Sequence, residues 1–85
     1  MNPRQRALLV AIASFWQDWG TAPSTSQLAE ITELCMEDVW TELYALERVG
    51  WIQFRRETGK GLRRPLNAEL TGKAEEILPR LRQLQ

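Results

Sequence analysis

Five basic side chains gather within ten residues of this 85-residue chain. They are Arg55, Arg56, Lys60, Arg63 and Arg64. Gly59 and Gly61 lie among them, and Glu57 is the one acid. The glycines allow a tight turn that can approach a ligand closely, and the cations attract phosphates in a salt-dependent, sequence-independent way. The segment therefore predicts contact with a nucleic-acid backbone. The alternative is a solvated hairpin whose charges protect a sheet edge.

A second group of chemically useful residues follows one face of a helix expected between Met36 and Val49. Val39, Leu43 and Leu46 are spaced by four and then three residues, which marks the inner face of an α-helix. The outward positions near the start of this helix are Met36, Glu37, Asp38, Trp40, Thr41 and Tyr44. On a helix lying in a DNA groove, Trp40, Thr41 and Tyr44 would supply selectivity.

Glu37 and Asp38 conflict with that interpretation. Carboxylates in a first turn favour the helix dipole by about 0.3–1 kcal/mol, but they repel phosphates. A carboxylate can accept a hydrogen bond from a cytosine amino group. The alternative hypothesis is that Glu37, Asp38 and Trp40 dock on a basic protein partner, since Trp is frequent at interaction hot spots. Trp40 could instead be a partly buried ring packed on the preceding helix or on the hairpin.

The first helix is expected over residues 3–19, with Asn2 as its cap and Pro3 at its first position. Its wide apolar stripe predicts a core-facing helix. The members of the stripe are Leu8, Leu9, Ile12, Phe15, Trp16 and Trp19. Alternatively, Leu9 or Trp16 lies at a dimer interface. Arg4 and Arg6 at the start of this helix could touch flanking phosphates.

Residues 24–49 predict a helix-turn-helix. Ser24 can cap the first of the two helices, and Gln27 completes a capping box. The helical pattern is interrupted between Thr32 and Met36, and Gly50 suits the left-handed residue after the second helix.

Residues 51–70 predict a hairpin, or wing. Ile52 and Phe54 would point to one face of its first strand, with Gln53 and Arg55 on the other. The returning strand carries Leu62, Leu66, Ala68 and Leu70, so Pro65 must lie on an edge or at a bulge.

The last helix is expected over residues 72–84, with Thr71 as its cap. Pro79 lies in its interior, where a proline removes a hydrogen bond, so we expect a kink or a break near Leu78. Leu78, Leu81 and Leu84 form a stripe with little core left to cover. This stripe predicts a homodimer.

The opening of the chain resembles the winged helix DNA-binding domain of LexA-type repressors. The matching residues are Pro3-Arg4-Gln5, Leu9, Ile12, Gly20, Pro23-Ser24, Leu28-Ala29-Glu30, Leu43, Leu46-Glu47 and Gly50. The ending Glu69-Leu70-Thr71-Gly72-Lys73-Ala74 is similar to the strand-to-helix step of MarR-type regulators. The resemblance implies that the second motif helix reads the major groove while the wing lies along the backbone or in the minor groove. It does not imply self-cleavage, because nothing like the LexA protease domain follows.

Composition narrows the function classes. Residues 1–50 carry a net charge of −4 and residues 51–85 a net charge of +4, which indicates a localised basic surface. The chain has no histidine, one cysteine and no glycine-rich phosphate loop. A zinc site, a cofactor and enzyme activity are therefore not expected. No membrane helix, signal peptide or disulfide pattern is recognisable, which predicts a cytoplasmic protein.

These observations predict one domain over residues 1–85, mainly α with a small β-hairpin, of the winged helix-turn-helix class. The function expected from it is that of a small transcriptional regulator that binds double-stranded DNA. The alternative is a winged helix that binds a protein partner, because the fold alone does not fix the function.

Overall fold

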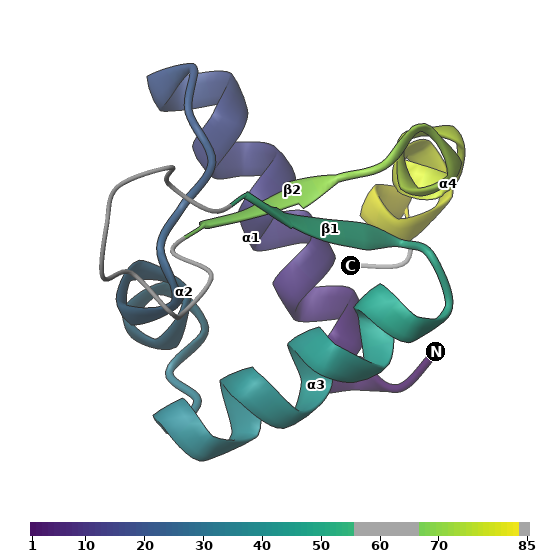
Figure 1. Ribbon diagram of the computed structural model, residues 1–85. Coiled ribbons are helices and arrows are strands. Elements are labelled where there is room, and N and C mark those ends of the chain that lie inside the picture. Colours follow the sequence, from purple (N-terminus) through teal and green to yellow (C-terminus); the bar gives the residue numbers. More distant parts are fainter. Residues whose placement is uncertain (56–66, 84–85) are drawn as a thin grey trace.

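The chain forms four helices and two strands within residues 1–55 and 67–83, which are the residues that the computed structural model describes (Figure 1). Of these, the side chains of Arg55, Asn67 and residues 81–83 are not described. The fold is mainly helical with a small antiparallel sheet, as the sequence predicts. The elements are α1 (Pro3–Trp19), α2 (Thr25–Thr32), α3 (Met36–Arg48), β1 (Ile52–Arg55), β2 (Asn67–Leu70) and α4 (Gly72–Gln83).

Capping boxes fix where the first two helices begin. The Asn2 side chain accepts a hydrogen bond from the Gln5 backbone N–H at 2.7 Å, and the Gln5 side chain accepts one from the Asn2 backbone. Ser24 and Gln27 exchange the same pair of hydrogen bonds at the start of α2. Each box satisfies backbone donors that a first turn leaves without a helical partner. The expected caps of both helices are thus confirmed.

A three-residue turn connects α2 to α3. Glu33 ends α2 in the left-handed conformation, with φ of 60°, and α3 begins after Cys35. The expected break between Thr32 and Met36 is confirmed. Gly50 follows α3 with φ of 85°, a conformation that glycine adopts without a Cβ clash. The chain can therefore reverse there and enter β1 directly.

The two strands pair antiparallel, with Ile52 opposite Leu70 and Phe54 opposite Ala68. Ile52 is buried and Gln53 is exposed, so the expected alternation is confirmed at these positions. The Ala68 backbone N–H donates to the Pro23 carbonyl at 3.3 Å, which ties the connector before α2 to β2. The sheet is thereby joined to the helical part of the fold.

Thr71 joins the end of α3 to the start of α4. Its hydroxyl donates to the Gly50 carbonyl at 2.6 Å and accepts the Ala74 N–H at 3.4 Å, as expected of a cap. Lys73 donates to the Val49 carbonyl at 2.8 Å, and its ammonium lies 4.5 Å from the centre of the Trp51 ring. These contacts set the direction in which α4 leaves the sheet.

The helix does not break at Leu78, because α4 continues through Pro79 to Gln83. Of the expected kink or break, the break is thus excluded. Pro79 lacks the N–H that would bond to the Glu75 carbonyl, and both residues are exposed. Water can therefore satisfy that carbonyl, which lowers the cost of a proline inside the helix.

The core lies where α1, α2, α3 and the sheet meet, with α1 passing behind the strands (Figure 1). Its largest fully buried side chains are Leu8, Leu9, Ile12, Pro23, Leu28, Val39, Leu43, Leu46 and Ile52. Because Leu9 is completely buried, the interpretation of Leu9 as a dimer contact is wrong. Trp16, Trp19 and Ile31 are exposed instead. Among the described residues, no helix has both the length and the apolar character needed to cross a membrane.

Replacing Leu43 by alanine should lower the free energy of unfolding by about 2–5 kcal/mol, since it leaves a cavity in the core. The matched control is Ile31→Ala on α2, whose side chain is half exposed, and which should cost less than about 1 kcal/mol. Chemical denaturation followed by circular dichroism measures both. Equal losses in the two variants would contradict this description of the core.

Candidate functional site

The surface of α3 has three sides around its buried stripe. Val39, Leu43 and Leu46 face the core and are fully buried. Trp40 and Tyr44 lie on the side toward β1, and Asp38 and Glu42 lie on the side toward α1. Between these sides runs an exposed row with helical spacing, which we call the outer ridge of α3. Its members are Glu37, Thr41, Tyr44 and Arg48, of which Tyr44 also borders the side toward β1.

Three rings join α3 to β1 in an aromatic cluster of Trp40, Tyr44 and Phe54. Trp40 stacks on Tyr44 with 5.5 Å between ring centres, and Phe54 lies 6.0 Å from Trp40 and 5.6 Å from Tyr44. Trp40 and Phe54 are half-buried, while Tyr44 is 51% exposed. The expectation that Trp40 packs on the hairpin is confirmed for its contact with β1. The cluster still presents an aromatic edge beside the outer ridge.

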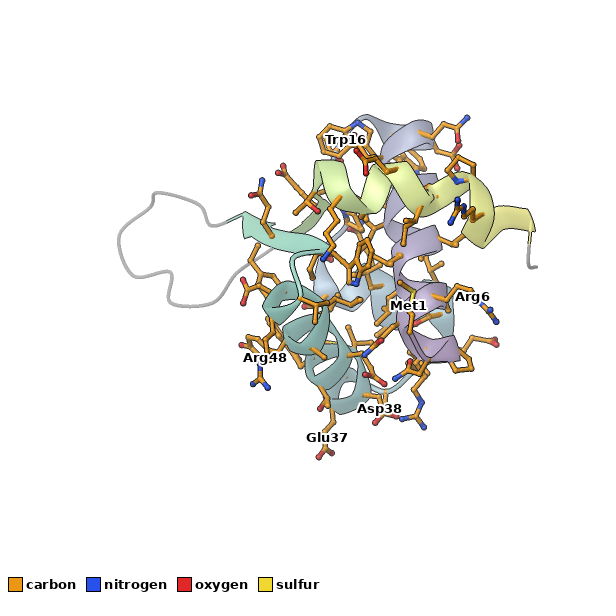
Figure 2. The ribbon with its side chains drawn as sticks, turned by 90° about the vertical axis from the view of Figure 1, so that its right-hand side faces the viewer. Met1, Arg6, Trp16, Glu37, Asp38 and Arg48 are labelled. Carbon is orange, nitrogen blue, oxygen red and sulfur yellow. The ribbon has the colours of Figure 1, made fainter. Side chains whose placement is uncertain are left out.

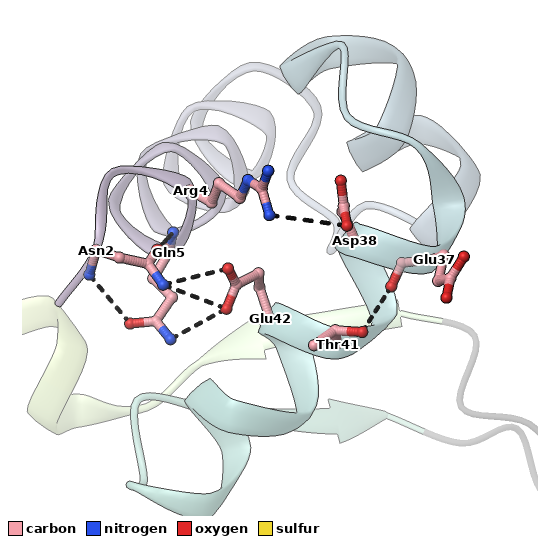
Figure 3. Close-up of polar contacts among 7 residues, drawn as sticks. All are labelled: Asn2, Arg4, Gln5, Glu37, Asp38, Thr41 and Glu42. Atoms are coloured by element: carbon pink, nitrogen blue, oxygen red, sulfur yellow. Dashed lines mark hydrogen bonds and ion pairs between the residues drawn. The ribbon is translucent and has the colours of Figure 1, made fainter.

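Two acids of α3 point toward the start of α1 and find partners there (Figure 3). The Asp38 carboxylate lies 3.7 Å from the Arg4 guanidinium. Glu42 accepts hydrogen bonds from the side-chain amides of Asn2, at 3.2 and 3.4 Å, and of Gln5, at 3.2 Å. Arg4 of α1 is therefore the cation that offsets the charge of Asp38.

Glu37 is the acid left on the outer ridge. Its side chain is exposed. Its backbone carbonyl oxygen accepts a hydrogen bond from the Thr41 hydroxyl, with 2.9 Å between the two oxygens. The Thr41 oxygen keeps its ability to accept a further hydrogen bond. Figure 2 shows Glu37 and Arg48 pointing away from the body of the molecule. The ridge thus begins with a negative charge and ends with a positive one.

The basic segment expected from the sequence, residues 55–64, begins at the last residue of β1. Arg56, Lys60, Arg63 and Arg64 lie outside the described residues, and Arg55 is described only as the last residue of β1. Arg55 pairs with Asn67, so the segment leaves and rejoins the sheet at that end of the ladder. Phe54 of the aromatic cluster immediately precedes Arg55. The basic segment therefore starts within two residues of the ring contacts with α3.

Two of the three residues expected at a dimer interface, Leu78 and Leu81, belong to α4. Leu78 is half-buried against the core, Leu81 belongs to α4 without a described side chain, and Leu84 lies outside the described residues. Leu78 also lines a groove of about 200 Å³ between α1, β2 and α4. The other lining residues are Ile12, Ala13, Trp16, Glu69, Leu70 and Glu75.

The sequence patterns did not predict two features of the site. Phe54 was expected as a strand residue, not as part of the surface beside α3, and Arg4 was not expected to pair with Asp38. Within the described part of the chain, no three potential metal ligands come together. No protein-family model and no curated protein matches this chain. The function is therefore argued from the geometry of its own residues.

Replacing Glu42 by alanine should lower the free energy of unfolding by about 1–2 kcal/mol, because the partly buried carboxylate accepts hydrogen bonds from two α1 side chains. Glu47→Ala is the matched control, since Glu47 is an exposed acid on the same helix. It should change stability by less than about 0.5 kcal/mol. Urea unfolding of the two variants tests this, and an unaffected Glu42 variant would show that the contacts of Glu42 do not hold α1 and α3 together.

Proposed function

We propose that this chain is a small DNA-binding transcriptional regulator of the winged helix type. In this proposal α2 and α3 form the helix-turn-helix, and residues 51–70 form the wing. The observation that carries it is the aromatic cluster, because Phe54 holds the root of the basic segment against α3. A basic segment that follows a strand in contact with an exposed helix is compatible with binding to a DNA duplex.

The outer ridge of α3 supports a role in reading the major groove. It is exposed from Glu37 to Arg48, and the width of the major groove admits an α-helix. Thr41 offers a hydroxyl, and the rings of Trp40 and Tyr44 offer apolar contact with thymine methyl groups. These side chains would supply selectivity, while the cations of the wing would supply most of the affinity.

The acids of α3 oppose phosphate less than their number suggests. Asp38 is paired with Arg4, and Glu42 is held on the side toward α1. Glu37 alone remains on the outer ridge, where a carboxylate can accept a hydrogen bond from a cytosine amino group. The proposal therefore requires the five cations of the wing to outweigh Glu37 and Glu47, the two exposed acids of α3. These cations are Arg55, Arg56, Lys60, Arg63 and Arg64.

Random duplex DNA should bind with an affinity that falls steeply as salt rises, because the cations of the wing displace condensed counterions. Arg56→Ala and Arg63→Ala should each weaken binding to all sequences alike. Each should reduce the slope of log affinity against log salt by about 0.9 for every phosphate that the variant no longer neutralises. Fluorescence anisotropy at several salt concentrations measures both quantities.

The control for charge alone is Arg80→Ala, since Arg80 is an exposed cation on α4. It should leave both the affinity and the salt slope nearly unchanged. Equal affinity of the original chain at low and high salt would overturn the wing as a phosphate-binding element. Absence of binding even at low salt would overturn the DNA-binding function as a whole.

A second candidate function is favoured by the same aromatic cluster. Tyr44 is half exposed, and Trp40 and Tyr44 lie on the helix that begins with Glu37 and Asp38. Aromatic anchors bordered by acids fit a basic protein partner that contributes an apolar side chain. In this alternative, α3 and the cluster form the docking surface, and the wing is a solvated hairpin.

Trp40→Ala separates the two functions. For a protein-binding module, the substitution should abolish capture of the partner while the original chain shows no affinity for DNA, because a central anchor contributes about 2 kcal/mol or more. Affinity capture followed by mass spectrometry reports the partner. Trp19→Ala is the matched control, since Trp19 is an exposed indole on α1. Equal capture by the original chain and the Trp40 variant would eliminate this alternative.

A further inference from the structure

The turn between α3 and β1 consists of Val49, Gly50 and Trp51, and we call it the corner. The Gly50 backbone N–H donates to the Glu47 carbonyl at 3.0 Å. The Trp51 backbone N–H donates to the Leu46 carbonyl, also at 3.0 Å. With Gly50 in the left-handed conformation, these two hydrogen bonds form the Schellman arrangement that ends many helices. Because β1 begins at the next residue, the corner sets the angle between α3 and the sheet.

The side chain of Lys73, in the first turn of α4, contacts both ends of the corner. Its ammonium donates to the Val49 carbonyl at 2.8 Å and lies 4.5 Å from the centre of the Trp51 ring. A cation at the last carbonyls of a helix also interacts favourably with the helix dipole. Trp51 is half-buried and packs against the core, so its ring holds the ammonium at a fixed place. Figure 1 shows the end of α3, the start of β1 and the start of α4 on the same side of the molecule.

The corner lies at one end of the two-stranded sheet, and the basic segment begins at the other end. Ile52 pairs with Leu70 beside the corner. Arg55 pairs with Asn67 where the basic segment begins. At about 3.4 Å per residue, the strand from Ile52 to Arg55 is roughly 10 Å long. A change of angle at the corner therefore becomes a displacement of Arg55 relative to α3.

We propose that Lys73 is a positioning residue for DNA binding. It holds the sheet at the angle to α3 at which the helix and the basic segment contact the same duplex, and this inference rests on the proposed function. Lys73 does not contact the DNA itself, because the Val49 carbonyl and the Trp51 ring hold its ammonium. The cations of the wing differ from it, since their role in the proposed function is to neutralise phosphates.

Lys73→Met removes the ammonium and keeps most of the aliphatic chain. It should weaken binding to duplex DNA roughly three- to tenfold at every salt concentration, and the slope of log affinity against log salt should stay unchanged. Lys73→Arg should recover the original affinity, because a guanidinium also donates hydrogen bonds and stacks on an aromatic ring. Fluorescence anisotropy measures these quantities at a temperature where circular dichroism shows each variant folded.

The matched control is Arg80→Met, since Arg80 is an exposed cation of the same helix. It should change neither the affinity nor the salt slope. A lower affinity of Lys73→Met together with a smaller salt slope would identify Lys73 as a phosphate contact and overturn the positioning role. An unchanged affinity of Lys73→Met would overturn that role as well.

Residual dipolar couplings of backbone N–H groups give the orientation of the sheet relative to α3 without DNA. In the original chain and in Lys73→Arg, the couplings of α3, β1 and β2 should fit one common alignment. In Lys73→Met, the couplings of the two strands should no longer fit the alignment of α3, and a common fit would overturn the inference. Absence of DNA binding by the original chain would overturn the proposed function, while the couplings would still decide whether Lys73 sets the angle of the sheet.

Discussion

Three fully buried side chains, Val39, Leu43 and Leu46, fix the rotation of α3 about its own axis. They pack against a core to which Leu8 and Ile12 of α1 contribute, so the helix cannot turn without exposing them to water. Once that rotation is fixed, helical geometry assigns a direction to every other residue of α3. The rings of Trp40 and Tyr44 then face the sheet, Asp38 and Glu42 face the start of α1, and the outer ridge faces solvent.

This division of α3 reduces the conflict between its charge and the proposed role in DNA binding. The acids of α3 are Glu37, Asp38, Glu42 and Glu47, and only Glu37 lies on the outer ridge. Asp38 is next to Arg4, and Glu42 accepts amide hydrogen bonds from α1. The effect of a charged group on a bound ligand depends on whether the group lies on the surface that the ligand contacts. On the outer ridge itself, the negative charge is therefore confined to its first residue, Glu37.

Local chemistry made most of the fold predictable from the sequence. The capping boxes of Asn2 and Ser24 join residues three positions apart, and the positive φ of Gly50 depends on that residue alone. The site was less predictable, because its contacts join residues far apart in the chain. Arg4 and Asp38 are 34 positions apart, and Trp40 and Phe54 are 14 apart. No periodicity encodes such pairs.

The junction at Thr71 connects the end of α3 to the start of α4. Its hydroxyl bonds to Gly50 at the end of α3 and its backbone starts α4, so the two helices have a fixed relative direction.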